Sequence, residues 1–120
     1  MLTLSPAVRI YIATGATDLR RSIDGLSALV RARFDLDPLS GHLFLFRNRR
    51  GDRLKILLWD HAGFWVLYKR LEQGTFAWPV DADADSTPVE MGHRDLLLLL
   101  SGVDVAGTRR RRWYERVASR

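Results

Sequence analysis

The fold is decided by residues 43–71, which read LFLFRNRRGDRLKILLWDHAGFWVLYKRL. This stretch contains three runs rich in apolar and aromatic residues: Leu43 to Arg47, Leu54 to Asp60 and Phe64 to Leu71. Such runs are typical of strands, and each is separated from the next by turn residues that include a glycine. The stretch therefore predicts a meander of antiparallel strands, and Thr75 to Val80 predicts one more strand after the turn at Gly74.

Alternation along these strands predicts which side chains share a face. The expected core set of the second strand is Leu54, Ile56 and Leu58. On the opposite face we expect Lys55 to lie near Lys69 and Trp59 to lie near Trp65. That second face would mix tryptophans with cations and would be partly exposed.

The flanking sequence supplies helices for the sheet. Upstream, Val8 to Ala13 predicts a short strand, and a stripe of apolar residues predicts an amphipathic helix from Thr17, as its cap, to about Phe34. Downstream, a leucine run followed by Gly102 predicts a short helix near residues 92–101. We therefore expect an α+β fold, with an antiparallel meander packed against one N-terminal helix. Residues 1–107 would form one domain and residues 108–120 a basic tail.

Composition excludes several classes of function. The chain has 120 residues and no cysteine, which excludes disulfides, thiolate metal sites and cysteine nucleophiles. No segment approaches the roughly 20 apolar residues of a membrane span, and the N-terminus lacks the pattern of a signal peptide. We expect a soluble cytoplasmic protein that binds neither a membrane nor a small-molecule substrate.

Charge is strongly polarised along the chain. Residues 47–70 carry seven cations and two carboxylates, and residues 109–120 carry six and one, so each block has a net charge of +5. The intervening residues 71–108 carry one cation and seven carboxylates, a net charge of −6. Seventeen of the nineteen cations are arginine, which suits bidentate contacts with phosphate or carboxylate. The expected partner is a polyanion or an acidic protein surface.

The candidate DNA contacts are the cations of the predicted hairpin, of the third strand and of the tail. They are Arg47, Arg49, Arg50, Arg53, Lys55, Lys69, Arg109, Arg110, Arg111 and Arg112. The candidate partner-binding residues are aromatic: Trp59, Phe64, Trp65 and Trp113. A charged hairpin tip and a solvated terminus that only keep the protein soluble are the alternative interpretation of these cations.

Neither a metal nor a cofactor site is expected. The acidic stretch at Asp81, Asp83 and Asp85 begins like a calcium-binding loop, but the glycine and the closing glutamate of such a loop are missing. The three histidines are far apart in the sequence, and no nucleophile, base and orienting group can be assembled. The chain is therefore not expected to be an enzyme. A metal-dependent nuclease using Asp18, Asp24 or Asp60 is the weakest alternative.

Two blocks carry a resemblance to a known family. The first is Thr17 to Leu26, and the second extends from Leu43 through Trp59-Asp60 and Gly63-Phe64-Trp65 to Trp78-Pro79. Together they resemble the small TnpB accessory protein of the insertion-sequence-66 family, which is unrelated to the larger RNA-guided nuclease of the same name. The resemblance implies a protein that is encoded beside a separate transposase and needed with it for transposition, with no assigned catalytic residues.

The sequence thus predicts non-enzymatic assistance of transposition through binding of DNA at the element ends. The contacts would come from the loop at Arg49 to Arg53 and the tail at Arg109 to Arg112. If about four to six phosphates are neutralised, log affinity falls with log salt at a slope near −4 to −5. The alternative is an interaction module whose Gly63-Phe64-Trp65 region and basic hairpin dock on the transposase or on a second accessory protein, without DNA contact.

Overall fold

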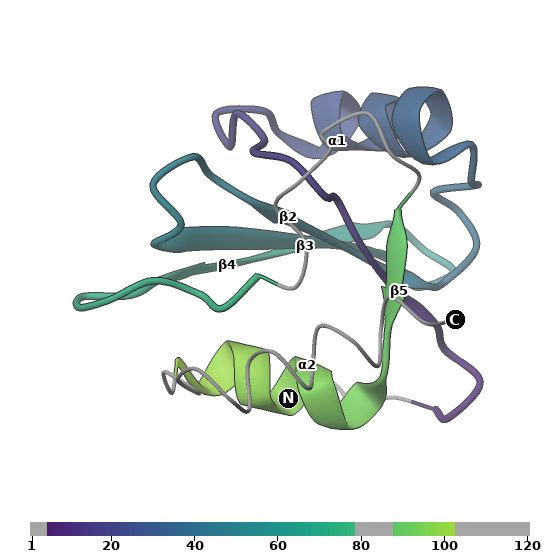
Figure 1. The fold of residues 1–120 in the computed structure, drawn as a ribbon. Coiled ribbons are helices and arrows are strands. Elements are labelled where there is room, and N and C mark those ends of the chain that lie inside the picture. The colour runs from purple at the N-terminus through teal and green to yellow at the C-terminus, as the bar shows by residue number, and fades with distance from the viewer. Residues whose placement is uncertain (1–4, 79–87, 103–120) are drawn as a thin grey trace.

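The predicted meander forms one side of a larger sheet in the computed structural model, which describes residues 5–78 and 88–102 (Figure 1). The sheet has five strands in the order β4-β3-β2-β1-β5. The strands are β1 (Ile10–Ile12), β2 (Leu43–Arg47), β3 (Arg53–Trp59), β4 (Phe64–Arg70) and β5 (Val89–Met91). The helices are α1 (Ile23–Leu29), which continues as the π-helical segment η1 (Val30–Phe34), and α2 (His93–Ser101).

The α+β fold expected from the sequence is confirmed, and the sheet is mixed. Strands β2, β3 and β4 pair antiparallel, as predicted. Strand β1 pairs parallel with β2 because α1 and η1 carry the chain back across the sheet between them, and β5 pairs antiparallel with the other edge of β1. Strand β5 has only three residues and was not predicted.

Each face of the sheet has a core, which corrects the expectation that only one face is core. Figure 1 shows α1 on one side of the sheet and α2 on the other. The α1 side buries Ala13, Leu26, Val30, Phe34, Phe44, Phe46 and Leu57. The expected core set Leu54, Ile56 and Leu58 packs on the α2 side, against Leu96 and Leu99 among others. Apolar residues on both faces of β2 and β3 therefore fill two cores rather than one.

The register of β3 and β4 differs by one residue from the predicted one. Lys55 lies opposite Tyr68, whereas Lys69 lies opposite Leu54. The cause is the turn: the amide of Asp60 donates to the carbonyl of Gly63 at 3.1 Å, so only two residues separate the paired ends instead of three. Because side chains alternate between faces, this shift puts Lys55 and Lys69 on opposite faces of the sheet. Trp59 and Trp65 are separated in the same way.

Helix α1 begins at Ile23, with Ser22 as its N-cap, and not at Thr17. Thr17 lies five residues before the N-cap, and its amide donates to the carbonyl of Arg47 at 2.9 Å, which holds the segment after β1 beside the end of β2. The C-terminal end is as predicted: η1 ends at Phe34, and Asp35 follows with a φ of 54°. Helix α2 begins directly after Gly92, also as predicted.

The strand predicted over Thr75 to Val80 is not formed in its described part, residues 75–78. This segment packs under the sheet through its side chains, with Phe76 and Trp78 both buried in the α2-side core. The indole nitrogen of Trp78 donates to the carbonyl of Ala13 at 2.7 Å. Among the described residues, no helix has the length and apolar character needed to cross a membrane.

Candidate nucleic-acid interface

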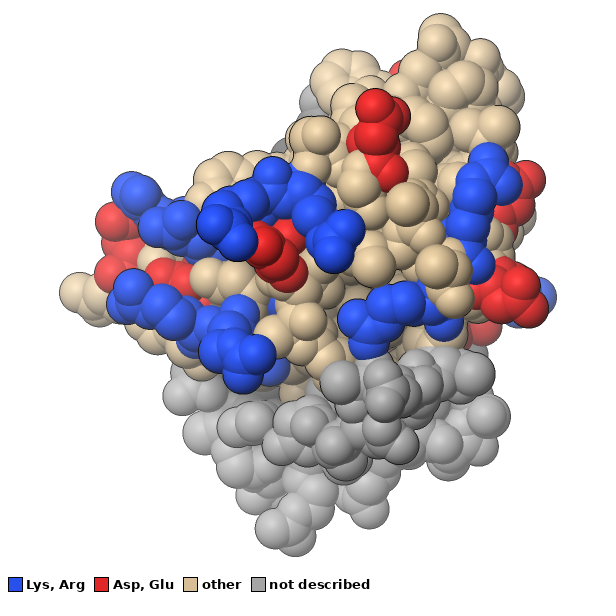
Figure 2. Space-filling view, turned by 90° about the horizontal axis from the view of Figure 1, so that it is seen from above, with Lys and Arg blue, Asp and Glu red and all other residues tan. Residues whose placement is uncertain are grey.

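An open groove of about 750 Å³ lies on the α1 side of the sheet, beside the β2–β3 loop. Its walls are the segment between β1 and α1, the β2–β3 loop, and parts of β3 and β4. The lining residues are Ala16, Thr17, Asp18, Leu19, Arg20, Asn48, Arg49, Arg50, Arg53, Lys55, Val66 and Tyr68. Five of them are cationic and one is acidic, so the groove is strongly positive. Figure 2 shows Lys and Arg side chains gathered toward one side of the α1 face, with acidic side chains between them.

Asn48 organises the β2–β3 loop from within. Its side-chain oxygen accepts the amides of Gly51 and Arg53, both at 3.0 Å, and its side-chain nitrogen donates to Asp52 at 2.9 Å. This last bond, with the positive charges of Arg50 and Arg53 nearby, lowers the pKa of Asp52. An asparagine side chain that bonds to backbone amides of its own turn stabilises one conformation of the loop. The loop is therefore a shaped platform for the arginines it carries.

The loop is also fastened to the segment that follows β4. The amide of Phe76 donates to the carbonyl of Gly51, and that of Leu71 donates to the carbonyl of Asp52, both at 2.8 Å. Gly51 itself has a φ of +80°, a conformation that favours glycine. These bonds leave the side chains of Arg49, Arg50 and Arg53 directed at the groove and its rim. Within the described part of the chain, none of the three guanidinium groups has a hydrogen-bond or ion-pair partner.

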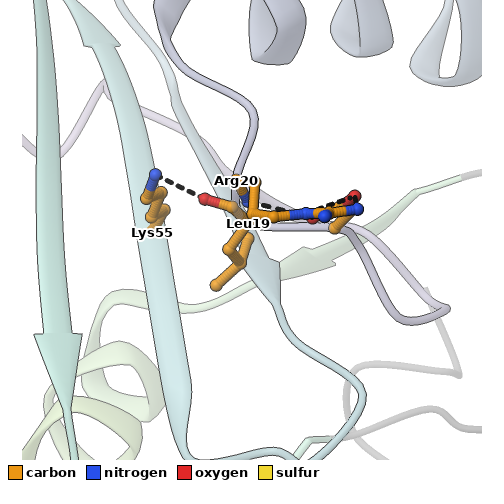
Figure 3. Close-up of polar contacts among 4 residues, drawn as sticks. Leu19, Arg20 and Lys55 are labelled. Atoms are coloured by element: carbon orange, nitrogen blue, oxygen red, sulfur yellow. Dashed lines mark hydrogen bonds and ion pairs between the residues drawn. The ribbon is translucent and has the colours of Figure 1, made fainter.

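The opposite wall, formed by the segment between β1 and α1, is held by two sets of hydrogen bonds (Figure 3). Arg20 donates from Nε and Nη2 to the carboxylate of Asp18, at 3.0 and 2.7 Å. This pairing is the main reason that the pKa of Asp18 is well below its usual range. Lys55 reaches from β3 and donates through Nζ to the carbonyl of Leu19 at 2.6 Å and to that of Arg21 at 3.1 Å. Lys55 thus ties the segment before α1 to the sheet.

The family of IS66 Orf2-like proteins matches residues 8–110, a span that includes the groove and both of its walls. The chain belongs to this family. Its membership supports a role as an accessory protein of transposition.

Two relatives are similar to this IS66 Orf2-like protein over most of their length, both from Sinorhizobium fredii strain NBRC 101917 / NGR234. Uncharacterized protein y4hO is 39% identical over 104 residues, which are 87% of this chain and 88% of the relative. Uncharacterized protein y4jC is 36% identical over 111 residues, which are 92% of each chain. No solved structure matches the chain.

Of the cations predicted to contact DNA, the structure brings Arg49, Arg50, Arg53 and Lys55 of this IS66 Orf2-like protein to the groove. Arg47 is not among the residues that line the groove. Because alternation along β2 places it on the α2 side, its guanidinium donates to the carbonyl of Phe76 at 3.0 Å and stacks 5.2 Å from the ring centre of Trp78.

Lys69 also lies outside the groove and not beside Lys55, since the observed register places it on the α2 side. Its Nζ donates to the carbonyl of Leu100 at 2.6 Å, near the end of α2. A cation at that position offsets the partial negative charge of a helix C-terminus. The tail residues Arg109, Arg110, Arg111, Arg112 and Trp113 lie outside the described residues.

The aromatic residues proposed for partner binding do not form one patch. Trp59 and Phe64 pack edge to face at 5.1 Å, and both are partly buried. Trp65 lies on the other face and is 49% exposed. Its indole nitrogen donates to Oδ2 of Asp60 at 2.6 Å, and this bond is the largest reason that the pKa of Asp60 is lowered.

The groove includes residues that the sequence did not single out, chiefly Tyr68 and Arg20. Tyr68 was missed because the predicted register put Lys69, not Tyr68, beside Lys55. Arg20 fell within the helix predicted from Thr17, whereas it precedes the observed helix. The available signal was the turn length: a two-residue turn at His61 and Ala62 gives the observed register.

In the part of the chain that the structure describes, no three metal-ligating side chains come together. His42 accepts the amide of Arg9 at 2.9 Å, and His93 lies 2.7 Å from the carbonyl of Val8. Asp18 and Asp60, two of the three carboxylates considered for a nuclease, are bonded to different side chains. The acidic stretch at Asp81, Asp83 and Asp85 lies outside the described residues.

Proposed function

We propose that this protein is a non-catalytic accessory factor of transposition that binds DNA through the groove beside the β2–β3 loop. The observation that carries the proposal is a set of three guanidinium groups without an ion pair among the described residues, those of Arg49 and Arg50 on the internally bonded loop and of Arg53 at the start of β3. Arginine presents a planar fork of donors that matches two phosphate oxygens. None of the three arginines forms an ion pair within the described part of the chain, so their guanidinium groups remain available to a polyanion.

The other two cations of the groove have structural partners and contribute less. Arg20 is paired with Asp18, and Lys55 is bonded to two backbone carbonyls. The groove alone would therefore neutralise about three phosphates, which gives a salt slope near −3 on duplex DNA. Contacts to phosphate fix position and orientation without reading sequence. Such contacts suit a protein that holds or shapes DNA for a separate transposase.

The test is the salt dependence of DNA affinity for the full chain and for Arg→Gln variants at positions 49, 50 and 53. Each single variant should reduce the salt slope by about 0.9, and the triple variant should lose at least about tenfold in affinity at low salt. Arg31→Gln is the matched control, because Arg31 is exposed on η1 and outside the groove. Equal slopes for the triple variant and the Arg31 variant would contradict the proposal, as would no binding of DNA at low salt.

A second candidate function is docking on the transposase through Trp65, and one observation favours it. The ring is half exposed and held in orientation by Asp60, which is how a preorganised aromatic anchor is presented. Co-purification with the element's transposase after nuclease treatment should then persist for the native chain and fall for Trp65→Ala. If nuclease treatment alone abolishes co-purification of the native chain with the transposase, the result favours DNA as the molecule that joins the two proteins.

A further inference from the structure

Tyr68 occupies an unusual position in the groove. It lies near the middle of β4, on the α1 side of the sheet, and is 53% exposed although it is a large aromatic residue. Val66 on the same strand and Leu19 on the opposite wall line the groove with it. The groove therefore has an apolar and aromatic part next to its arginine rim.

The phenol ring has a fixed cationic neighbour. Lys55 lies directly opposite Tyr68 in the β3–β4 register, and its Nζ is 5.7 Å from the centre of the ring. That ammonium group is itself held by the carbonyls of Leu19 and Arg21. A cation at this distance interacts favourably with an aromatic face and favours one ring orientation. The contact therefore reduces the freedom that the ring has to lose on binding.

A half-exposed ring beside unpaired arginines matches the chemistry of single-strand recognition. In a duplex each base is covered by its stacked neighbours, so no base face is available to a side chain. An unpaired base offers its π-face, and stacking on an aromatic side chain is worth about 1–3 kcal/mol per base. Phosphates on either side of that base are then within the reach of an arginine rim.

We infer that the groove binds an unpaired stretch of DNA, with one base stacked on Tyr68 and the flanking phosphates held by Arg49, Arg50 and Arg53. This inference rests on the proposed DNA-binding function and specifies the form of DNA that the site takes. A role for Trp65 in the same contact is excluded by its position. It has similar exposure on the same strand but lies on the face away from the groove.

The experiment uses the full chain and three fluorescent probes: a short oligothymidine, a strand of equal length made of abasic sites, and a duplex of that length. The abasic strand keeps the phosphates and lacks the bases. The native chain should bind oligothymidine at least about fivefold more tightly than the abasic strand. Tyr68→Leu should abolish that difference and leave abasic-strand affinity unchanged. Tyr68→Phe should keep it, and so should Trp65→Leu, the matched control.

Ultraviolet crosslinking to oligothymidine gives a readout that needs no variant, and the crosslinked peptide should contain Tyr68. Equal affinity of the native chain for the oligothymidine and abasic strands overturns the inference but leaves arginine-dependent binding intact. The same holds if Tyr68→Leu retains the difference, or if crosslinks form only outside the groove. Failure of all three probes to bind at low salt overturns the proposed function itself.

Discussion

The carboxylate of Asp60 makes most of the side-chain bonds at the β3–β4 turn. One oxygen accepts the amides of Ala62 and Gly63, at 3.3 and 3.2 Å, and the other accepts the indole N–H of Trp65 at 2.6 Å. These donors stabilise the charged form, so the pKa of Asp60 falls below its ordinary value of 3.8. One residue therefore sets both the turn and the orientation of the exposed tryptophan.

A pH titration should detect this contact. Because the folded pKa is depressed, the contribution of Asp60 to stability is complete above the unfolded value near 3.8 and is lost as pH falls through the lower folded pKa. The indole N–H resonance of Trp65 in a ¹H–¹⁵N spectrum should shift with a midpoint below pH 3.8. In Asp60→Asn the resonance should lie at a different position and show no such titration. An identical titration in the variant would show that protonation of Asp60 does not cause the shift of the Trp65 resonance.

The β2–β3 loop is the element on which the proposed site depends, and Gly51 is its most constrained position. The backbone at this position has a φ of +80°, which is unfavourable for a residue with a side chain. A methyl group added there would lie 3.3 Å from both Nη1 of Arg47 and Cβ of Thr75. The left-handed conformation costs a residue with a side chain roughly 1–2 kcal/mol. The loop conformation and the loop's attachment to Phe76 both depend on this glycine.

Gly51→Ala should therefore lower the free energy of unfolding by about 1–2 kcal/mol and weaken DNA binding through the displaced arginines. Gly63→Ala is the matched control, since Gly63 has no positive φ and no atom within 4 Å of an added Cβ. Chemical denaturation of both variants measures the difference. Equal stability of the two variants would show that the conformation of Gly51 does not hold the loop.

At the scale of elements, local pattern was sufficient for much of the fold and for part of the site. Strand β2 was predicted with its observed bounds, and β3, β4 and α2 within one residue at each end, because each has a clear apolar period or a glycine boundary. The loop arginines followed from the same local pattern. Tyr68 did not, because one hydrogen bond between Asp60 and Gly63 fixes the register. A shift of one residue exchanges the faces of every β4 side chain.

At the scale of the whole molecule, the features that were not predicted depend on pairing between distant residues. The three residues of β5 carry almost no pattern of their own, and they become a strand only because Ile10, Tyr11 and Ile12 offer a free edge. The core on the α2 side also depends on residues far apart in the sequence, since both α2 and residues 75–78 pack on that face of the sheet. The segment 17–21 was predicted as helix because local pattern does not show the bonds that hold it outside the helix. Those bonds join it to Arg47 and Lys55, which lie far away in the sequence.

The position of β1 between β2 and β5 has a consequence for biosynthesis. Its partner on one side follows about thirty residues later, but its partner on the other side follows about eighty residues later. Since chains are made from the N-terminus and begin to fold as they emerge, α1 and the β1–β4 part of the sheet can assemble on the ribosome first. During that interval β1 is an open edge, able to pair with a neighbouring nascent chain until Val89–Met91 emerge to close it.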